Sequence, residues 1–581
     1  MTSLPLTLDQ RPPTVAHLFL DRVRATPDAP AYRFPTAEGG PWGELSWSGT
    51  AERVTAIAAG LLSLGINPTE RVAIASSTRV EWILADLAVM CAGLATTTVY
   101  PTTNSDETAY ILADSSSRVL FAEDAAQVGK VLSEHDRLPD LTTVIVFDAP
   151  EEPLASEHFR ILTLPELEHQ GTLHLKDQPE SVQKAVDELR QDQLATLIYT
   201  SGTTGRPKGV RLDHACWSYQ GAAPVITGLL RHDDVHFLWL PLSHVFGKTL
   251  ICGQIATGHV MAVDGRVDKV VENLQTIRPT VTAAVPRIFE KIYGNLTARA
   301  TPATGGPDAH AVRAAFGGRL RIAVCGSAAL SPDITSFFLD AGVPILEGYG
   351  LTETAAGSTV NRADAIRVGT VGVPYPGTEV RIAEDGEILL RGPGVMRGYH
   401  NLPEKTAEVL DADGWFRTGD IGELGPDGSL RITDRKKDLF KTSGGKYIAP
   451  SEVEGRLKAL CPFVSNVVVI GDRRNYCTAL ITLDATVLLP WAVTQGIPGD
   501  YAEVVDAPAT RLLVDGYVRT LNEGLQRWQT IKKFTLLPRD LDIEHGELTP
   551  SLKVKRTVVT RLHEDAVSAM YEGDGTPAHR A

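Results

Sequence analysis

Short runs rich in β-branched residues alternate with segments of helical periodicity from about residue 70 onward. The first run, 71–76 (RVAIAS), precedes a helical pattern over 78–93, which is followed by a second strand pattern at 96–100. Strands separated by helices are typical of βαβ units, which build parallel sheets covered by helices on both faces. Further strands are expected at 194–200, 234–242, 280–286, 319–326 and 343–350. The sequence therefore predicts an α/β protein with mixed, mainly parallel sheets flanked by helices.

The pattern changes twice in the last third of the chain. At 379–392 two strand patterns flank an Asp-Gly pair (EVRIAEDGEILLRG), which predicts a β-hairpin. Farther on, a helical pattern at 451–460 precedes two strand patterns at 466–472 and 478–484. This mixture is typical of a small α+β domain.

The length of the chain also favours two domains, because 581 residues exceed what one compact core accommodates. We expect a large N-terminal domain over 1–434, which includes a β-rich subdomain, and a small C-terminal α+β domain over 435–581. The stretch 301–311 is rich in Pro, Gly and Ala and is expected to be a surface loop.

Composition excludes several classes of protein. Lys and Arg number 56 against 71 Asp and Glu, and this net charge of −15 disfavours a nucleic-acid binder. The six cysteines form no CxxC pair, so neither a zinc site nor a disulfide framework is expected. The N-terminus lacks a signal-peptide pattern, and the apolar stretch 82–100 is interrupted by Asp86 and Gly93, as in a buried helix and strand. These features predict a cytoplasmic protein.

One loop carries a strong chemical signal. The string YTSGTTGRPKGV, at 199–210, follows a predicted strand, and α/β sheets bind ligands at the carboxyl ends of their strands. Its glycines allow backbone N–H groups to approach phosphate oxygens, and its hydroxyl groups add donors. The P-loop of NTPases requires Gly-Lys-Ser/Thr, whereas here Pro207 precedes Lys208. The alternative is a plain surface turn.

Six further motifs follow this loop in order: PLSHVFG (241–247), CGSAAL (325–330), EGYGLTET (347–354), GWFRTGD (414–420), DRKKDLFKTSGGKYIAPSEVE (434–454) and TPSLKVKR (549–556). Together with the loop they resemble the signatures of the adenylate-forming superfamily of acyl-CoA synthetases, luciferases and peptide-synthetase adenylation domains. The resemblance covers essentially the whole chain. The variant FKTSGGKYIAPSEVE looks most like the long-chain fatty acyl-CoA synthetase branch.

The resemblance implies a two-step reaction. A fatty acid is activated by ATP to an acyl-adenylate, and the acyl group then passes to coenzyme A, with release of pyrophosphate and AMP. Mg²⁺ is the implied cofactor, and a mobile C-terminal domain is implied to serve both steps. Three alternatives stay open: a ligase that passes the acyl group to a carrier protein, a ligase for a non-fatty acid, and a non-catalytic relative. Long acyl chains partition into bilayers, which is compatible with peripheral contact with a membrane. The sequence indicates neither chain length nor oligomeric state.

The resemblance also implies the roles of individual residues. Binding of ATP or AMP is expected from Thr200, Ser201, Gly202, Thr203, Thr204, Gly205, Lys208, Gly326, Ser327, Ala328, Glu347, Gly348, Tyr349, Gly350, Thr352, Asp420 and Arg435. Catalytic roles are expected for Lys553, His244, Thr352 and Glu353, with Thr200 and Glu353 holding Mg²⁺. Lys437 is the expected hinge, and Ser443, Gly444 and Gly445 are expected to line the path of coenzyme A.

These roles have a chemical rationale. Activation brings a carboxylate against the α-phosphate of ATP, so cations and hydrogen-bond donors are needed between two anions. In the implied arrangement Tyr349 presents its ring to adenine, Asp420 accepts hydrogen bonds from the ribose, and His244 lines the pocket for the acyl carboxylate. Lys553 reaches the adenylation site, and Lys555, two residues away on an extended segment, is expected to face the same side.

One position departs from the family pattern. Some relatives in the fatty-acid branch carry a gating tryptophan four residues after the motif histidine, and this chain has Lys248 there. An aromatic gate over the acyl tunnel is therefore not expected.

Overall fold

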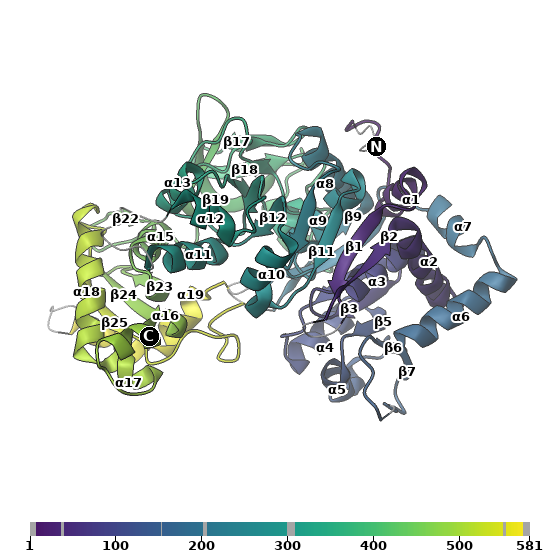
Figure 1. Ribbon diagram of the computed structural model, residues 1–581, viewed down its shortest axis with the longest axis horizontal. Coiled ribbons are helices and arrows are strands. Elements are labelled where there is room, and N and C mark those ends of the chain that lie inside the picture. Colours follow the sequence, from purple (N-terminus) through teal and green to yellow (C-terminus); the bar gives the residue numbers. More distant parts are fainter. Residues whose placement is uncertain are drawn as a thin grey trace.

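The computed structural model describes residues 7–36, 40–152, 154–200, 206–298, 308–549 and 553–572 (Figure 1). Five residues of the predicted phosphate loop, Ser201, Gly202, Thr203, Thr204 and Gly205, lie outside the described residues. The same holds for 301–307, most of the predicted loop at 301–311, of which Ala309 onward is helical.

Two large sheets form the N-terminal domain. The first has seven strands in the order β7-β6-β5-β3-β4-β8-β9, and all neighbours except β8 and β9 are parallel. Its strands are β3 (Arg71–Ala75), β4 (Ala95–Val99), β5 (Ser117–Ala122), β6 (Thr143–Val146), β7 (Arg160–Thr163), β8 (Leu194–Thr200) and β9 (Lys208–Asp213). The predicted phosphate loop therefore joins β8 to an antiparallel neighbour rather than to a helix.

The second sheet has nine strands in the order β16-β15-β14-β13-β12-β10-β11-β1-β2, with a parallel centre from β14 to β1. Its strands are β1 (Pro30–Pro35), β2 (Trp42–Ser46), β10 (Val235–Leu238), β11 (Val260–Val263), β12 (Val281–Ala284), β13 (Ile322–Cys325), β14 (Ile345–Tyr349), β15 (Thr359–Val360) and β16 (Val373–Pro374). Mixed, mainly parallel sheets are thus confirmed.

Helices cover both sheets and separate their strands. They are α1 (Val15–Ala25), α2 (Trp47–Ser63), α3 (Val80–Cys91), α4 (Ser105–Asp114), α5 (Ala125–Leu132), α6 (Leu164–Asp177), α7 (Ser181–Asp187), α8 (His214–Ile226), α9 (Val245–Thr257), α10 (Val270–Ile277), α11 (Pro286–Ala298), α12 (Ala309–Ala315), α13 (Pro332–Asp340) and α14 (Pro403–Val409). A single hydrophobic core runs through α1, α3, α8 and α9 and through strands of both sheets. It holds the two sheets in one domain.

Each strand predicted for the two large sheets is present, but many others, among them β5, β6 and β11, were not predicted. The predicted strand at 194–200 coincides with β8, whereas the strand predicted over 234–242 ends at Leu238. The chain turns there toward His244, which begins α9, so the remaining apolar residues of the run are buried outside the sheet. The apolar stretch 82–100 forms α3 and β4, as expected, and no described helix is long and apolar enough to cross a membrane.

The β-rich subdomain is an antiparallel sheet in the order β17-β18-β19-β20. Its strands are β17 (Glu379–Ile382), β18 (Glu387–Arg391), β19 (Phe416–Leu424) and β20 (Leu430–Arg435). β17 and β18 form the hairpin predicted from the Asp-Gly pair. Tyr349, at the end of β14, packs on this sheet and joins it to the nine-stranded sheet.

The C-terminal domain has hydrophobic cores of its own and lies beside α11 (Figure 1, yellow-green). Its elements are β21 (Phe440–Lys441), β22 (Tyr447–Ile448), α15 (Pro450–Leu460), β23 (Val464–Ile470), β24 (Cys477–Leu483), α16 (Ala485–Thr494), α17 (Tyr501–Asp506), α18 (Pro508–Glu523), β25 (Ile531–Leu536), α19 (Arg556–Leu562) and α20 (Glu564–Tyr571). The predicted α+β character is confirmed. The boundary between 434 and 435 falls at the end of β20 and stays a prediction.

Candidate active site

The motif residues gather where parallel strands of the second sheet end. His244 follows β10, Gly326 follows β13, and Tyr349 ends β14. Because the carboxyl ends of parallel strands share one edge of a sheet, segments more than one hundred residues apart meet there. Another pair at this edge, 80 positions apart, is close as well: a Cβ atom placed on Gly326 would lie 3.4 Å from the ring of Phe246, two residues after His244.

His244 is a neutral hydrogen-bond donor at this edge. Its Nδ1 accepts a hydrogen bond of 3.1 Å from the backbone N–H of Phe246 and so caps α9. This bond leaves the proton on Nε2. Burial, reinforced by the charge of Lys553, lowers the pKa of His244 to about 3. The imidazole is therefore uncharged near neutral pH and can donate from Nε2.

Lys553 comes from the C-terminal domain and lies at the same place. Burial and the charge of Arg435 lower its pKa to about 8, while Asp420 and Glu353 act in the opposite direction. Lys555 lies in a different environment, because its charge acts on Glu107 of α4. Val554, between the two lysines, forms an antiparallel bridge with Leu548, and α19 starts directly after Lys555. The expectation that Lys553 and Lys555 face the same side stays a prediction.

Asp420 is a buried carboxylate with partners from two segments. It is 4% exposed and accepts a 2.6 Å hydrogen bond from the hydroxyl of Tyr349. The Nε atom of Arg435 lies 3.4 Å from its other oxygen. Burial raises the pKa of Asp420, and the charges of Arg435 and Lys553 oppose this effect. The structure thus brings together Tyr349, Asp420, Arg435 and Lys553.

Glu353 lies in a second cluster of polar side chains, and the sequence motifs identify only some of its members. It sits in a 3₁₀ turn (Thr352–Thr354), and its Oε1 accepts a 2.8 Å hydrogen bond from the hydroxyl of Tyr399. The Nζ atom of Lys208 lies 4.8 Å from the centre of the Tyr399 ring, a cation–π contact. No motif contains Tyr399, so sequence reasoning missed it. Thr200 pairs with Lys208 at the ends of β8 and β9, and its Oγ1 lies 3.5 Å from the carbonyl of Lys208.

The turn that carries Glu353 has a constrained backbone. Ala355 and Ala356 adopt positive φ angles of 53° and 85°, a region that L-residues rarely occupy. A Cβ atom on Gly350 would lie 1.4 Å from the carbonyl oxygen of Ala356, so only glycine fits there. Strained backbone of this kind is found where the surrounding structure fixes it, often at functional sites.

Glu347 contacts the segment that follows β13. Ser327 has a positive φ of 73°, and the neighbouring Ala328 is exposed. Glu347 is buried, accepts a 3.3 Å hydrogen bond from Thr335 Oγ1, and interacts with the backbone of Leu330. Burial raises its pKa to about 7. Its side chain therefore fixes this loop.

The predicted hinge lies just beyond a firmly held residue. Lys436 N–H bonds to the carbonyl of Gly419, and its Nζ lies 2.7 Å from Asp385 and 3.1 Å from Glu387 of the β-rich subdomain. Lys437, the next residue, is exposed.

The three residues expected along the coenzyme A path do not join the group around Lys553. Ser443, Gly444 and Gly445 form the turn between β21 and β22. Ser443 hydrogen-bonds within the C-terminal domain, through its N–H to the carbonyl of Arg474 and through its hydroxyl to Asn475.

Lys248 is buried in the core one helical turn beyond His244. Its Nζ lies 2.6 Å and 2.5 Å from the two oxygens of Asp86 in α3, and the two side chains are 1% and 3% exposed. Thr96 Oγ1 donates to Asp86, and the ring centres of Trp82 and Trp217 lie 5.7 Å and 5.2 Å from the ammonium. Position 248 therefore holds a buried ion pair flanked by two indole rings. This agrees with the expectation that no aromatic gate is present there.

Comparison with known proteins agrees with this arrangement. Residues 19–400 match the family described as AMP-binding enzyme, and residues 437–575 match the AMP-binding enzyme C-terminal domain. The chain belongs to the AMP-binding enzyme family. The resemblance stated from the sequence motifs is thereby confirmed.

Its relatives and structural neighbours span the whole chain. A protein named Long-chain-fatty-acid--CoA ligase FadD15, from Mycobacterium bovis, is 34% identical and covers 96% of this chain and 97% of its own length. Long-chain-fatty-acid--CoA ligase ACSBG2 from Xenopus laevis is 28% identical over 97% of this chain and 85% of its own. The adenylation domain of a carboxylate reductase from Mycobacterium chelonae superposes with a TM-score of 0.78 at 22% identity, covering 96% of this chain and 91% of that one. The anthranilate CoA ligase AuaEII, in complex with anthranoyl-AMP, gives a TM-score of 0.75 at 21% identity, covering 97% and 100%. The fold is that of adenylate-forming enzymes.

We predict that Lys248 and Asp86 tolerate replacement only together. Lys248→Met leaves a buried carboxylate without its cation and is expected to lower the free energy of unfolding by about 3–5 kcal/mol. Lys248→Met/Asp86→Asn retains an acceptor for Thr96 and removes both charges, so it is expected to recover most of that loss. Urea denaturation of the two variants and the wild type measures the difference. A double variant as unstable as the single one contradicts the prediction.

We predict that Glu347 makes stability depend on pH. Its carboxyl group ionises near 4.5 in the unfolded chain and near 7 in the fold, so the folded state holds the proton more tightly. Stability from this source is complete below pH 4.5 and is lost as pH rises through 7. The free energy of unfolding of Glu347→Gln, relative to that of the wild type, should therefore increase by about 1–3 kcal/mol from pH 5 to pH 8. Urea denaturation at both pH values checks this, and Glu384→Gln, at an exposed position, should show no such change.

Proposed function

We propose that this protein is an ATP-dependent ligase that converts a fatty acid into its coenzyme A thioester. The observation that carries the proposal is the position of Lys553, which reaches from the C-terminal domain to the charges of Asp420, Glu353 and Arg435 and acts on His244. The similarity to named fatty-acid–CoA ligases over 96% of the chain supports the same reaction.

In the first step, a carboxylate oxygen of the fatty acid attacks the α-phosphorus of ATP and forms an acyl-phosphate bond. The bond from that phosphorus to pyrophosphate breaks, and pyrophosphate leaves with its electron pair. His244 donates from Nε2 to the acyl carboxylate, and the Lys553 ammonium stabilises negative charge between carboxylate and phosphate. Charge stabilisers of this kind are most effective where water is largely excluded, and both side chains are partly buried here.

Mg²⁺ fits the donor set around Glu353. It is a hard cation that takes oxygen ligands, commonly one or two carboxylates together with the phosphates of a substrate. Glu353 offers a carboxylate whose Oε1 is oriented by Tyr399, and Thr200 offers a hydroxyl oxygen. When bound, the ion would neutralise charge on the departing pyrophosphate.

The nucleotide is expected to lie along the strand ends. We assign the adenine to the space between Tyr349 and the segment Gly326, Ser327 and Ala328, and the ribose to Asp420 and Arg435. We assign the binding of the phosphates to Lys208, Thr352 and the loop 200–205. Gly348 and Gly350, on either side of Tyr349, carry no side chains that would occupy the space assigned to the nucleotide. Glu347 contributes through the loop that it supports.

In the second step, the sulfur of coenzyme A attacks the acyl carbonyl carbon, and AMP leaves with the electrons of the acyl-phosphate bond. We propose that the C-terminal domain turns about Lys437 between the two steps, which would withdraw Lys553 and bring Ser443, Gly444 and Gly445 to the acyl-adenylate. The firm attachment of Lys436 to the β-rich subdomain supports a pivot immediately after it. A domain that rotates between two poses lets one site serve both steps. A cytoplasmic location and peripheral membrane contact stay predictions.

We predict that saturated fatty acids are better substrates than acetate. Release of AMP should depend on both ATP and coenzyme A, and kcat/KM should rise as the acid is lengthened, because each buried methylene adds about 0.8 kcal/mol. A panel of acids from acetate to long-chain fatty acids, with AMP release as readout, measures this. Acyl-adenylate that accumulates without transfer to coenzyme A would instead indicate a carrier-protein ligase, and activity only on acids other than fatty acids would overturn the assigned substrate.

We predict that Lys553 serves the first step alone. Lys553→Ala should lower fatty-acid-dependent ATP–pyrophosphate exchange by two orders of magnitude or more, which corresponds to about 3 kcal/mol of transition-state stabilisation. Transfer from supplied acyl-AMP to coenzyme A should continue at a near-normal rate. Lys555→Ala is the matched control, because the charge of Lys555 acts on Glu107 of α4, and it should leave exchange intact. A larger loss of exchange in Lys555→Ala than in Lys553→Ala would reverse the assignment.

A further inference from the structure

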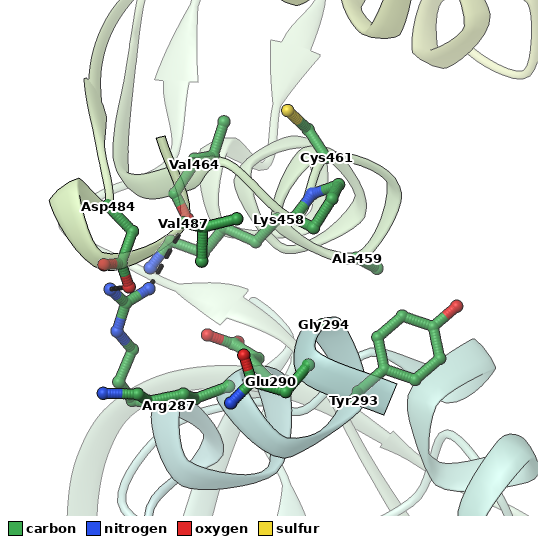
Figure 2. Close-up of a pocket in the computed structure, with 13 residues that line it drawn as sticks. Arg287, Glu290, Tyr293, Gly294, Lys458, Ala459, Cys461, Val464, Asp484 and Val487 are labelled. Carbon is green, nitrogen blue, oxygen red and sulfur yellow. Dashed lines mark hydrogen bonds and ion pairs between the residues drawn. The ribbon is translucent and has the colours of Figure 1, made fainter. Parts of the chain in front are cut away.

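One arginine makes a set of contacts from the N-terminal to the C-terminal domain. Arg287 lies in the first turn of α11, directly after β12. Its Nη2 lies 3.1 Å from Oδ2 of Asp484 and 3.0 Å from Oγ of Ser465, and its Nη1 lies 3.2 Å from the carbonyl of Ser465 and 3.5 Å from that of Val464. Figure 2 shows the guanidinium reaching up to Asp484 across the gap between the domains.

The acceptors that meet this guanidinium are already fixed within the C-terminal domain. Asp484 caps α16 with its other oxygen, Oδ1, which accepts hydrogen bonds from the N–H and the hydroxyl of Thr486 at 2.9 Å and 2.7 Å. Ser465 is part of β23, and its hydroxyl also bonds to Asp540. A planar guanidinium loses little freedom when it binds a prearranged set of oxygens, so the contact fixes orientation as well as distance.

The surroundings of this contact include charged side chains and a small crevice. The crevice beside it, between α11 and α15, has a volume of about 30 Å³, room for no more than a few waters, and is lined in part by Glu290, Lys291 and Lys458 (Figure 2). The described contacts of Arg287 across this gap are hydrogen bonds and one ion pair, which water can replace when the two surfaces separate. The contact is suited to form and break repeatedly.

The hydrogen bonds of Arg287 run between the domains. The described acceptors of its guanidinium all belong to residues 464–484, and the two sides of the contact are 177 to 197 positions apart in the chain. Removal of the guanidinium therefore leaves the internal hydrogen bonds of both domains in place and weakens the domain orientation seen here. This is the orientation in which Lys553 lies beside Asp420 and His244.

We propose that Arg287, with Asp484 and Ser465, is a positioning residue that docks the C-terminal domain for the adenylation step. The inference rests on the proposed two-step function, since docking matters to only one of the two steps. Arg287 acts through Lys553: it holds the domain in the pose that delivers the lysine, and it releases the domain when coenzyme A is to react.

The test measures the two half-reactions separately in Arg287→Met, Asp484→Asn and the double variant. Asp484→Asn retains Oδ1 as the cap of α16 and removes the charge that Arg287 meets. We expect each single variant to lower fatty-acid-dependent ATP–pyrophosphate exchange about fivefold to thirtyfold, and the double variant to be no worse than either. Transfer from supplied acyl-AMP to coenzyme A should be unchanged or faster. Arg287→Lys should restore part of the exchange rate.

The control is Arg24→Met, which removes an exposed arginine of α1 that pairs with Asp21, three residues away; both half-reactions should stay at the wild-type rate. Equal loss of both half-reactions in Arg287→Met, or no loss of exchange, overturns the docking role. So does a double variant with the summed effects of the two single ones. Failure of the wild-type protein to catalyse either half-reaction instead refutes the proposed function, so the two ideas are tested independently.

Discussion

The burial of one carboxylate, Asp420, organises the candidate active site. A charge held at 4% exposure is stable only if hydrogen bonds and opposite charges compensate for lost water. The compensating groups come from three places: the hydroxyl of Tyr349 at the end of β14, the guanidinium of Arg435 at the end of β20, and the ammonium of Lys553 from the C-terminal domain. Compensation of this single charge therefore links the nine-stranded sheet, the β-rich subdomain and the C-terminal domain.

The same arrangement explains why the position of the C-terminal domain matters. Lys553 is not held by a helix or a strand of the N-terminal domain, and its place at the site depends on how the two domains lie against each other. At α11 the described contacts between the domains include the hydrogen bonds of Arg287 and a small crevice lined by polar and apolar residues. Interfaces of this kind favour relative motion of domains, and they set its end points by directional bonds.

Local sequence patterns predicted the fold class. They did not predict contacts between side chains that are far apart in the chain. The Asp-Gly hairpin of β17 and β18 and the strand at 194–200 were located because each depends on residues close together in the chain. The family motifs likewise indicated Asp420, Tyr349, His244 and Lys553, which the structure brings together. Tyr399 was missed because it belongs to no motif and meets Glu353 from 46 positions away. The Lys248–Asp86 pair, 162 positions apart, could not be inferred from either residue alone.

The pair formed by Lys248 and Asp86 also restricts how this part of the core can change during evolution. Replacement of either residue alone leaves a buried, uncompensated charge, a loss of about 3–5 kcal/mol. Natural proteins have a total stability of only about 5–15 kcal/mol, so each one-residue intermediate would lie close to unfolding. A descendant with an aromatic residue at position 248 would need a second change at position 86 in near succession. Because two changes are needed where one would destabilise the fold, the ion pair is expected to be inherited or lost as a unit.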